Sequence, residues 1–426
     1  MRLKLHWQIL IALVLAILAG ILAGRDASLL GITFLSMFAF IGTLFLNALK
    51  MIIVPLVMSS IITGIANAGD GQGLGRLGGK TILFYVTSTM LAVITGLVFV
   101  NFFTPGLLDG EPLNKVLGLD MSLAQEAADK VGDRDISVIA DVFLSMVPPN
   151  IVEAASKGQM LGLIFFSLLF GYFMTRVERL PGETMKNFWL GLFQIMLKIT
   201  DLVMRFAPIG IFGLVAKVVA EIEPSELSTL AESTGRFFIT VLLALAVHVF
   251  LTLPLALKYI ARVNPLRHYQ AMSPALLTAF STASSSATLP LTMECVEKRA
   301  GVSNRTTSFV LPLGATINMD GTALYECVAA MFIAQAYGMD LSIGTQFLVV
   351  TIAILTSIGV AAVPAASLVA ISIILAAIGL PAEGIGLLLA VDRILDMLRT
   401  ATNVFSDSCA AVVIASSEGE KNLLNS

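Results

Sequence analysis

Long apolar segments limit what this chain can fold into. The stretches 6–23, 29–67, 81–103 and 160–174 each approach or exceed the roughly 20 residues with which a helix crosses a bilayer. Only 13% of the 426 residues are charged, whereas a soluble domain carries roughly 25%. This composition excludes an ordinary soluble domain. The sequence predicts an all-α membrane protein.

About eight transmembrane helices are expected, and basic residues indicate their orientation. The predicted helices lie near residues 7–24, 29–68, 81–104, 158–176, 187–220, 233–260, 306–337 and 384–415. The second and fifth are longer than one crossing needs, and Pro55 and Pro208 are the expected bends. We interpret the N-terminal segment as the first helix and not as a cleaved signal. Lys and Arg accumulate in loops on one side, which places both termini in the cytoplasm of a bacterial-type inner (plasma) membrane.

Net charge and cysteine spacing exclude other classes. The formal net charge is −3, which gives no reason to expect a nucleic-acid partner. Cys295, Cys327 and Cys409 have no metal-binding spacing, and we interpret them as small packing residues. No organic cofactor is expected.

Two further apolar stretches carry breaks instead of a continuous span. No charge lies between His268 and Glu294, yet the middle reads SSSATLP; none lies between Asp340 and Glu383, yet Pro364 interrupts that stretch. Backbone that leaves a helix at membrane depth is tolerated only when protein buries it or it lines a cavity. We therefore predict two re-entrant helical hairpins. The alternative is two Ser-rich spans of a channel or scaffold.

The two predicted hairpins are expected to enter from opposite sides. Basic residues flank the first hairpin, and Asp340 and Glu383 flank the second. Each is followed by a helix that carries carboxylates. A hairpin and a polar helix repeated in opposite orientation are typical of transporters built from inverted repeats.

The last predicted span carries a charged stripe. Asp392, Asp396, Arg399, Asn403 and Asp407 fall within an arc of roughly 80° when a helix turns about 100° per residue. Each charge costs about 3 kcal/mol at the centre of a membrane helix. The stripe is therefore expected to face a polar site, the alternative being a seam of salt bridges between helices.

The segment Asn318-Met-Asp320-Gly321-Thr322 places polar groups at every second residue. That period does not suit one helix face, so we predict a locally unwound strand, made feasible by Gly321. Its oxygen atoms, with those of Asn403 and Asp407, are suited to Na⁺. A helix break merely capped by Asn and Asp is the alternative.

Three motifs together resemble one known family. SSSATLP, NMDGTALYE and DRILDMLRTATNV are similar to the dicarboxylate/amino acid:cation symporter family, which includes glutamate and aspartate transporters, and the resemblance covers nearly the whole chain. It implies a homotrimer. It also implies a scaffold of residues 1–80 and 146–225, a transport domain of 81–104 and 226–426, and an extracellular polar loop of 105–145.

The resemblance implies a site for an acidic amino acid. Arg399 would bind the substrate side-chain carboxylate beside Thr322, and Asp396 would bind the amino group. Val363 would close over the substrate as an extracellular gate. The remaining contacts would come from Ser284, Ser285, Thr400 and Asn403. Having both Asp396 and Arg399 favours glutamate or aspartate over a C4-dicarboxylate or a neutral amino acid.

The resemblance also implies co-transported cations. One Na⁺ would lie at Gly314, Asn318, Asn403 and Asp407. Another would lie at Tyr85, Ser88, Thr89, Asn318 and Asp320. A third would take carbonyls of Thr316, Ser357, Ile358 and Val360. Glu326, desolvated and near Asp320 and Asp396, would carry a proton, unless it stays permanently neutral.

Two departures and three alternatives remain. Glu326 occupies a position that is glutamine in many prokaryotic members of the family and, in animal glutamate transporters, a glutamate tied to proton coupling. Family members for acidic amino acids often carry another arginine where this chain has Ala283 or Met397, so that cation is missing and potassium counter-transport is in doubt. A proton-driven glutamate or C4-dicarboxylate symporter without sodium coupling is one alternative, and an ion channel is another. An intramembrane serine hydrolase is disfavoured, because His248 is the only histidine in a predicted span and is interpreted as a hydrogen-bonded packing residue.

Overall fold

The computed structural model is mostly helical, as the sequence predicts. It describes residues 5–424 except 26, 30, 70–73, 109, 114, 116–143, 145–146, 158–159, 222–226, 360–365, 381 and 422. Most of the polar loop predicted at 105–145 therefore lies outside the described residues.

The first half of the chain forms seven described helices and two short strand pairs. The helices are α1 (Leu5–Ala23), α2 (Phe34–Gly69), α3 (Leu74–Phe103), α7 (Ile151–Ser156), α8 (Met160–Met174), α9 (Arg179–Arg205) and α10 (Ala207–Glu221). The antiparallel pairs are β1 (Ser28–Leu29) with β2 (Ile32–Thr33), and β3 (Leu107–Leu108) with β4 (Glu111–Pro112).

The second half contains the polar helices. These are α11 (Leu227–Val247), η2 (His248–Thr252), α12 (Leu253–Ala256), η3 (Leu257–Ala261), α13 (Pro265–Thr282), α14 (Ser285–Lys298), α15 (Asn304–Ile317), α16 (Asp320–Ala336), α17 (Ile343–Gly359), α18 (Ala366–Ala377), η4 (Ala382–Leu387) and α19 (Leu389–Ser417). Elements η2 and η3 are π-helical turns, and η4 is a 3₁₀ helix.

The two predicted bends have different outcomes. The chain breaks between α9 and α10, directly before Pro208, as expected. Proline is tolerated there because the first helical N–H groups have no intrahelical partner. By contrast, α2 continues as one helix through Pro55. The hydroxyl of Ser59 donates to the Pro55 carbonyl at 2.6 Å.

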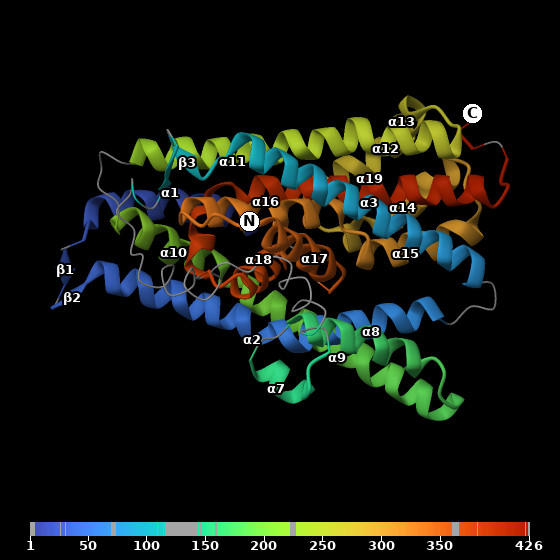
Figure 1. Ribbon diagram of the computed structural model, residues 1–426, viewed down its shortest axis with the longest axis horizontal. Helices are drawn as coiled ribbons and strands as arrows, with labels where there is room; N and C mark the ends of the chain where they lie inside the picture. Colours follow the sequence, from blue (N-terminus) through green and yellow to red (C-terminus); the bar gives the residue numbers. More distant parts are fainter. Residues whose placement is uncertain are drawn as a thin grey trace.

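The helices form two packed groups (Figure 1). In one, α2 packs against α8, α9 and α10, and α1 packs against α10. In the other, α16 and α19 lie at the centre and contact α3, α11, α13, α15 and α17. Figure 1 shows α2, α7, α8 and α9 along the lower edge and α11 to α13 along the upper edge. The polar helices α16 and α19 are thus enclosed by other helices.

Pairs of packed helices occur where the sequence predicts hairpins. Helices α13 and α14 pack against each other and are joined at Ala283, which adopts the left-handed conformation with φ 49°. Helices α17 and α18 also pack against each other, and residues 360–365 between them lie outside the described part. That these pairs are re-entrant in a membrane stays a prediction.

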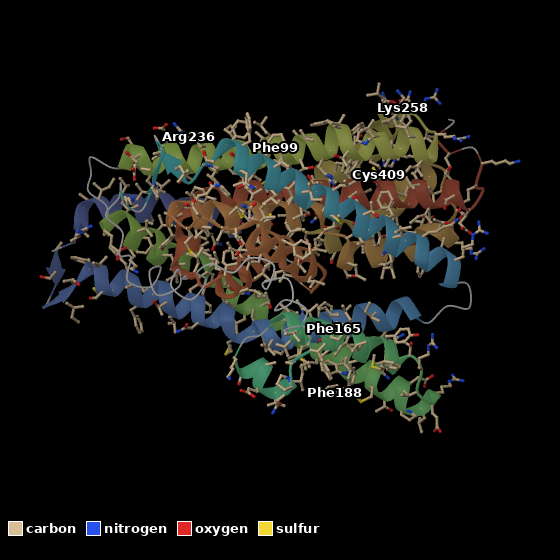
Figure 2. All side chains as sticks on the ribbon, viewed as in Figure 1. Phe99, Phe165, Phe188, Arg236, Lys258 and Cys409 are labelled. Carbon is tan, nitrogen blue, oxygen red and sulfur yellow. The ribbon has the colours of Figure 1, made fainter. Side chains whose placement is uncertain are left out.

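The outer surface is apolar over much of the described chain. Arg76–Phe103 and Ser228–Tyr259 are long and apolar enough, by length and composition, to cross a membrane. Figure 2 shows Arg236 and Lys258 toward opposite ends of the continuous helical segment from α11 to η3, and Cys409 in the interior. All three cysteines are buried and free, which agrees with their interpretation as packing residues.

The residues after α19 contact α3 and α15 at one end of the helical group that contains α16 and α19. Glu418 forms ion pairs with Lys80 and, at 3.2 Å, with Arg76, both in α3. Glu420 accepts hydrogen bonds from the Ser303 N–H at 2.7 Å and the Ser303 hydroxyl at 2.6 Å, and from the Thr306 hydroxyl. Its carboxylate therefore caps α15.

Replacing Glu420 by Gln should lower stability in a pH-dependent way. Burial raises the pKa of Glu420, but hydrogen bonds from Ser303 and Thr306 outweigh this effect and leave its pKa below the ordinary value. A lowered pKa stabilises the fold above the unfolded-state pKa of about 4.3, and this contribution is lost as the pH falls through the folded-state value. We expect a loss of about 1 kcal/mol at pH 7 that disappears below pH ~4. Thermal unfolding in detergent measures it, with exposed Glu111→Gln as control; equal midpoints at pH 7 would contradict it.

Candidate functional site

The break between α15 and α16 faces α19. Asn318 and Met319 leave the helical conformation (φ −95°, ψ 87° and φ −117°, ψ 58°), which confirms the predicted unwinding at these two residues. The prediction was wrong for residues 320–322, which already lie in α16. The Asn318 side chain donates to Asp407 Oδ1 at 2.9 Å and to Ser406 Oγ at 3.0 Å. Its Oδ1 atom is buried and has no hydrogen-bond partner among the described residues. The break therefore leaves an unused oxygen ligand beside a carboxylate.

Gly321 has a role that differs from the prediction. It lies inside α16, after the unwound residues, so it does not supply their freedom. A Cβ atom there would lie 2.7 Å from the Arg399 carbonyl. The missing side chain instead lets α16 approach α19 closely, and the Gly321 N–H donates to Asn403 Oδ1 at 2.8 Å. Asn403 Nδ2 donates to Thr322 Oγ1 at 3.0 Å.

Asp320 is surrounded by polar groups from three other elements. It is fully buried. It accepts hydrogen bonds from Thr89 at 2.7 Å and Ser406 at 2.7 Å, and from Ser88. His248 Nε2 lies 2.9 Å from Asp320 Oδ2. Since a buried carboxylate must be paired or hydrogen-bonded, this shell explains how Asp320 is held in the core.

Sequence reasoning found most of this shell but missed the partner of His248. Ser88, Thr89 and Asp320 were predicted together and lie together. Tyr85 lies nearby but donates to the Val310 carbonyl at 2.6 Å. His248 is hydrogen-bonded, as expected, and begins the π-helical turn η2 before Pro254. Such turns are frequent at functional sites, and a histidine six residues before a Pro in an apolar stretch was the available signal.

Arg399 is the centre of a buried ion-pair network. It is 1% exposed. Its NH1 lies 3.1 Å from Asp392 Oδ1, and its NH2 lies 2.9 Å from Asp396 Oδ1. Its guanidinium carbon lies 3.8 Å from the centre of the Tyr325 ring, and the Tyr325 hydroxyl donates to Asp392 at 2.8 Å. Paired carboxylates and an aromatic face offset the desolvation of the guanidinium.

The rest of the predicted substrate set lies in several environments. The Thr400 hydroxyl donates to the Asp396 carbonyl of its own helix at 2.8 Å. Ser284 caps α14, accepting from the Ala287 N–H at 3.2 Å, and Ser285 is buried at the start of that helix. Val363 and Val360 lie outside the described residues.

The third predicted cation group is described in part. Thr316 Oγ1 donates to the Leu313 carbonyl at 2.9 Å. Ser357 is buried, and its hydroxyl donates to the Ile354 carbonyl at 2.8 Å. Ile358 lies in the last turn of α17. Helices α15 and α17 pack against each other, which brings the two segments together.

Glu326 is fully buried, one turn after Thr322 on α16. The Thr356 hydroxyl of α17 donates to its Oε2 at 2.9 Å. Its Oε1 has no hydrogen-bond partner among the described residues. A carboxyl in such a setting is suited to being neutral. Thr356 was not among the predicted residues.

Two observations bear on the alternatives. In the described part of the chain, no three or more His, Cys, Asp or Glu side chains gather as a metal-binding group. The side chains around Asp320 and Asp407 offer mainly oxygen atoms, which hard cations prefer as ligands. A second histidine, His268, which lies outside the predicted spans, is also buried. Its Nε2 lies 2.9 Å from Ser408 Oγ, a serine outside the SSSATLP motif.

Comparison with known proteins decides the family. The Sodium:dicarboxylate symporter family matches residues 5–417. The chain belongs to this family. It is therefore an integral membrane protein of a symporter family.

Three relatives illustrate the range of similarity. A proton/glutamate-aspartate symporter of Escherichia coli (strain K12) is 37% identical over 97% of this chain and 93% of the relative. A proton/sodium-glutamate symport protein of Geobacillus stearothermophilus is 35% identical over 99% and 96%. Excitatory amino acid transporter 3 of Oryctolagus cuniculus is 36% identical over 97% and 86%.

Gly314→Ala should weaken cation binding. A Cβ at Gly314 would lie 2.5 Å from Asp407 Oδ1 and 2.7 Å from the Tyr85 hydroxyl, so the carboxylate must move. We expect the Na⁺ concentration for half-maximal thermal stabilisation of the detergent-solubilised protein to rise about tenfold. Gly235→Ala is the control, since a Cβ there meets no described heavy atom within 4 Å. An unchanged Na⁺ response would show that Gly314 and Asp407 do not border a cation site.

Proposed function

We propose that this protein is a secondary active symporter that takes up L-glutamate or L-aspartate together with Na⁺ and a proton. The observation that carries this proposal is the buried Arg399, which lies between two aspartates on the same helix. The named substrates of the relatives support the same substrate class.

The charges of the substrate match those of the α19 site. An acidic amino acid brings two carboxylates and one ammonium group. Arg399 is suited to the side-chain carboxylate, because its planar fork binds carboxylates through two parallel hydrogen bonds. Asp396 is suited to the ammonium group. A C4-dicarboxylate has no positive group for Asp396, which argues against that alternative.

Substrate binding would replace an internal salt bridge. Arg399 NH2 and Asp396 Oδ1 are 2.9 Å apart. When substrate binds, Arg399 would pair with the substrate side-chain carboxylate in place of Asp396. Asp396 would pair with the substrate ammonium group in place of Arg399. All four charges then remain paired, so the buried site avoids the several kcal/mol that an unpaired ion costs.

Sodium would bind at the oxygen groups around the α15–α16 break. Asn318, Asp407 and Gly314 border one site, and Asp320 with Ser88 and Thr89 borders another. The third site lies near Thr316, Ser357, Ile358 and Val360. The hydrogen bonds among these groups in the structure are those that Na⁺ would replace.

Alternating access is proposed to use the domains implied by the resemblance. Residues 1–80 and 146–225 would form the scaffold of a homotrimer, and 81–104 with 226–426 would move within it. The α13–α14 and α17–α18 pairs would be re-entrant hairpins, the second closing over substrate through Val363 as the extracellular gate. The protein would lie in a bacterial-type inner membrane with both termini cytoplasmic.

Arg399→Cys tests the substrate assignment. Losing the guanidinium leaves a buried substrate carboxylate unpaired, which costs about 2–5 kcal/mol. We expect uptake of radiolabelled glutamate and aspartate into proteoliposomes to fall to background, while small neutral amino acids gain access. Arg236→Cys, at an exposed pair with Glu232, is the matched control. Unchanged affinity for glutamate in Arg399→Cys would refute the assignment.

Glu326→Gln tests the proton. Glu326 is a fully buried carboxyl one helical turn after the proposed substrate residue Thr322 on α16. If it carries a proton with substrate, the variant keeps substrate exchange but loses the dependence of net uptake on an imposed pH gradient. Uptake with separate Na⁺ and H⁺ gradients measures this, with Glu232→Gln as control. A variant that keeps the pH dependence would exclude Glu326 as proton carrier, and wild-type uptake without Na⁺ would favour a purely proton-driven symporter.

A further inference from the structure

A second guanidinium contacts the aspartate proposed to bind the substrate amino group. Arg393 NH1 lies 3.1 Å from Asp396 Oδ2, while Arg399 NH2 contacts the other oxygen, Oδ1, at 2.9 Å. The side chains of Arg393 and Asp396 are only 12% and 11% exposed. The carboxylate of Asp396 is thus held from both sides by arginines of its own helix.

Arg393 stands where no arginine was expected. The resemblance implies an arginine at position 283 or 397, but this chain has Ala283 and Met397 there. Residue 393 lies about 100° around the helix from Asp392 and therefore outside the charged stripe. Its long side chain extends toward the C-terminus of the helix and contacts Asp396, three residues later. The missing cation is replaced from a third position.

The four charges of this network balance. Arg393 and Arg399 face Asp392 and Asp396, and the formal charges sum to zero. Without Arg393, one guanidinium would have to compensate two buried carboxylates. A net negative charge in a membrane-embedded core is costly, and a cation from solution would be needed to relieve it.

We infer that Arg393 is the built-in counter-cation of Asp396 in the empty carrier. It lets the substrate-free transport domain return across the membrane without a monovalent cation bound in its place. When substrate binds, its ammonium group joins Asp396 and Arg399 turns to the substrate carboxylate. This role rests on the proposed function, because it requires that Asp396 be vacated at each cycle.

Net uptake and exchange separate this role from substrate binding. Net uptake requires return of the empty carrier, whereas exchange of labelled for unlabelled substrate uses only the loaded one. In wild-type proteoliposomes, we expect net glutamate uptake to be equal with internal choline or internal K⁺. With choline inside, Arg393→Gln should lower net uptake about tenfold or more while exchange stays within about twofold.

Further variants sharpen the test. Arg393→Lys keeps the charge and should restore most of the net uptake. Arg393→Met keeps the aliphatic stem without the charge and should reproduce Arg393→Gln, which guards against an effect of the new amide on folding. Arg236→Gln, at an exposed arginine outside the network, should change neither assay.

The outcomes are distinct. Equal loss of exchange and net uptake in both uncharged variants would show that Arg393 only supports the site, and no change in either assay would show that it has no role; both overturn the inference. Net uptake by the wild type that requires internal K⁺ would also overturn it. A wild type that exchanges neither glutamate nor aspartate would refute the proposed function itself, and this role with it.

Discussion

Burial of the charges on α19 is the constraint on which the rest of the structure depends. Asp392, Asp396, Arg399 and Asp407 lie on one helix inside an apolar chain, and none can stay unpaired there. Their partners come from α16, from the break that precedes it and from α19 itself. Tyr325 contacts Arg399 and Asp392, and Asn318 contacts Asp407. The close approach of α16 to α19, permitted by the absence of a Cβ at Gly321, brings these partners into reach.

Features encoded by neighbouring residues were predictable. The 100° period placed the charged stripe on one face of the last helix, and the alternating polar residues from Asn318 to Thr322 indicated the break between α15 and α16. The small polar residues at 281–286 indicated the end of α13. These predictions succeed because helix periodicity and helix breaking are local properties.

Partner choice was not predictable, because it depends on packing between distant segments. Tyr325 and Asp392 are 67 residues apart, and His248 and Asp320 are 72 apart; in both cases one partner looked like an ordinary core aromatic residue or histidine. Arg393 was missed for a different reason. It lies outside the stripe by angle, so it was not counted with the stripe residues. However, it stands three residues before Asp396, and side chains at this spacing are neighbours on a helix.

The residues proposed to bind cations and those proposed to bind substrate are only two to four residues apart along α16 and along α19. This closeness gives a physical route for coupling in the proposed function. Asp320 in the cation shell is two residues before Thr322, and Asp407 is one turn after Asn403 on α19. The Gly321 N–H and the Thr322 hydroxyl both contact Asn403, so the two helices meet there in one hydrogen-bonded contact. A cation that draws Asn318 and Asp320 together would order the start of α16 and with it the position of Thr322 and Asn403. By linkage, substrate held by those two residues raises cation affinity by the same factor. Coupling between the cation and substrate sites then needs no long-range rearrangement. It needs only that the backbone between α15 and α16 become ordered when the cations bind.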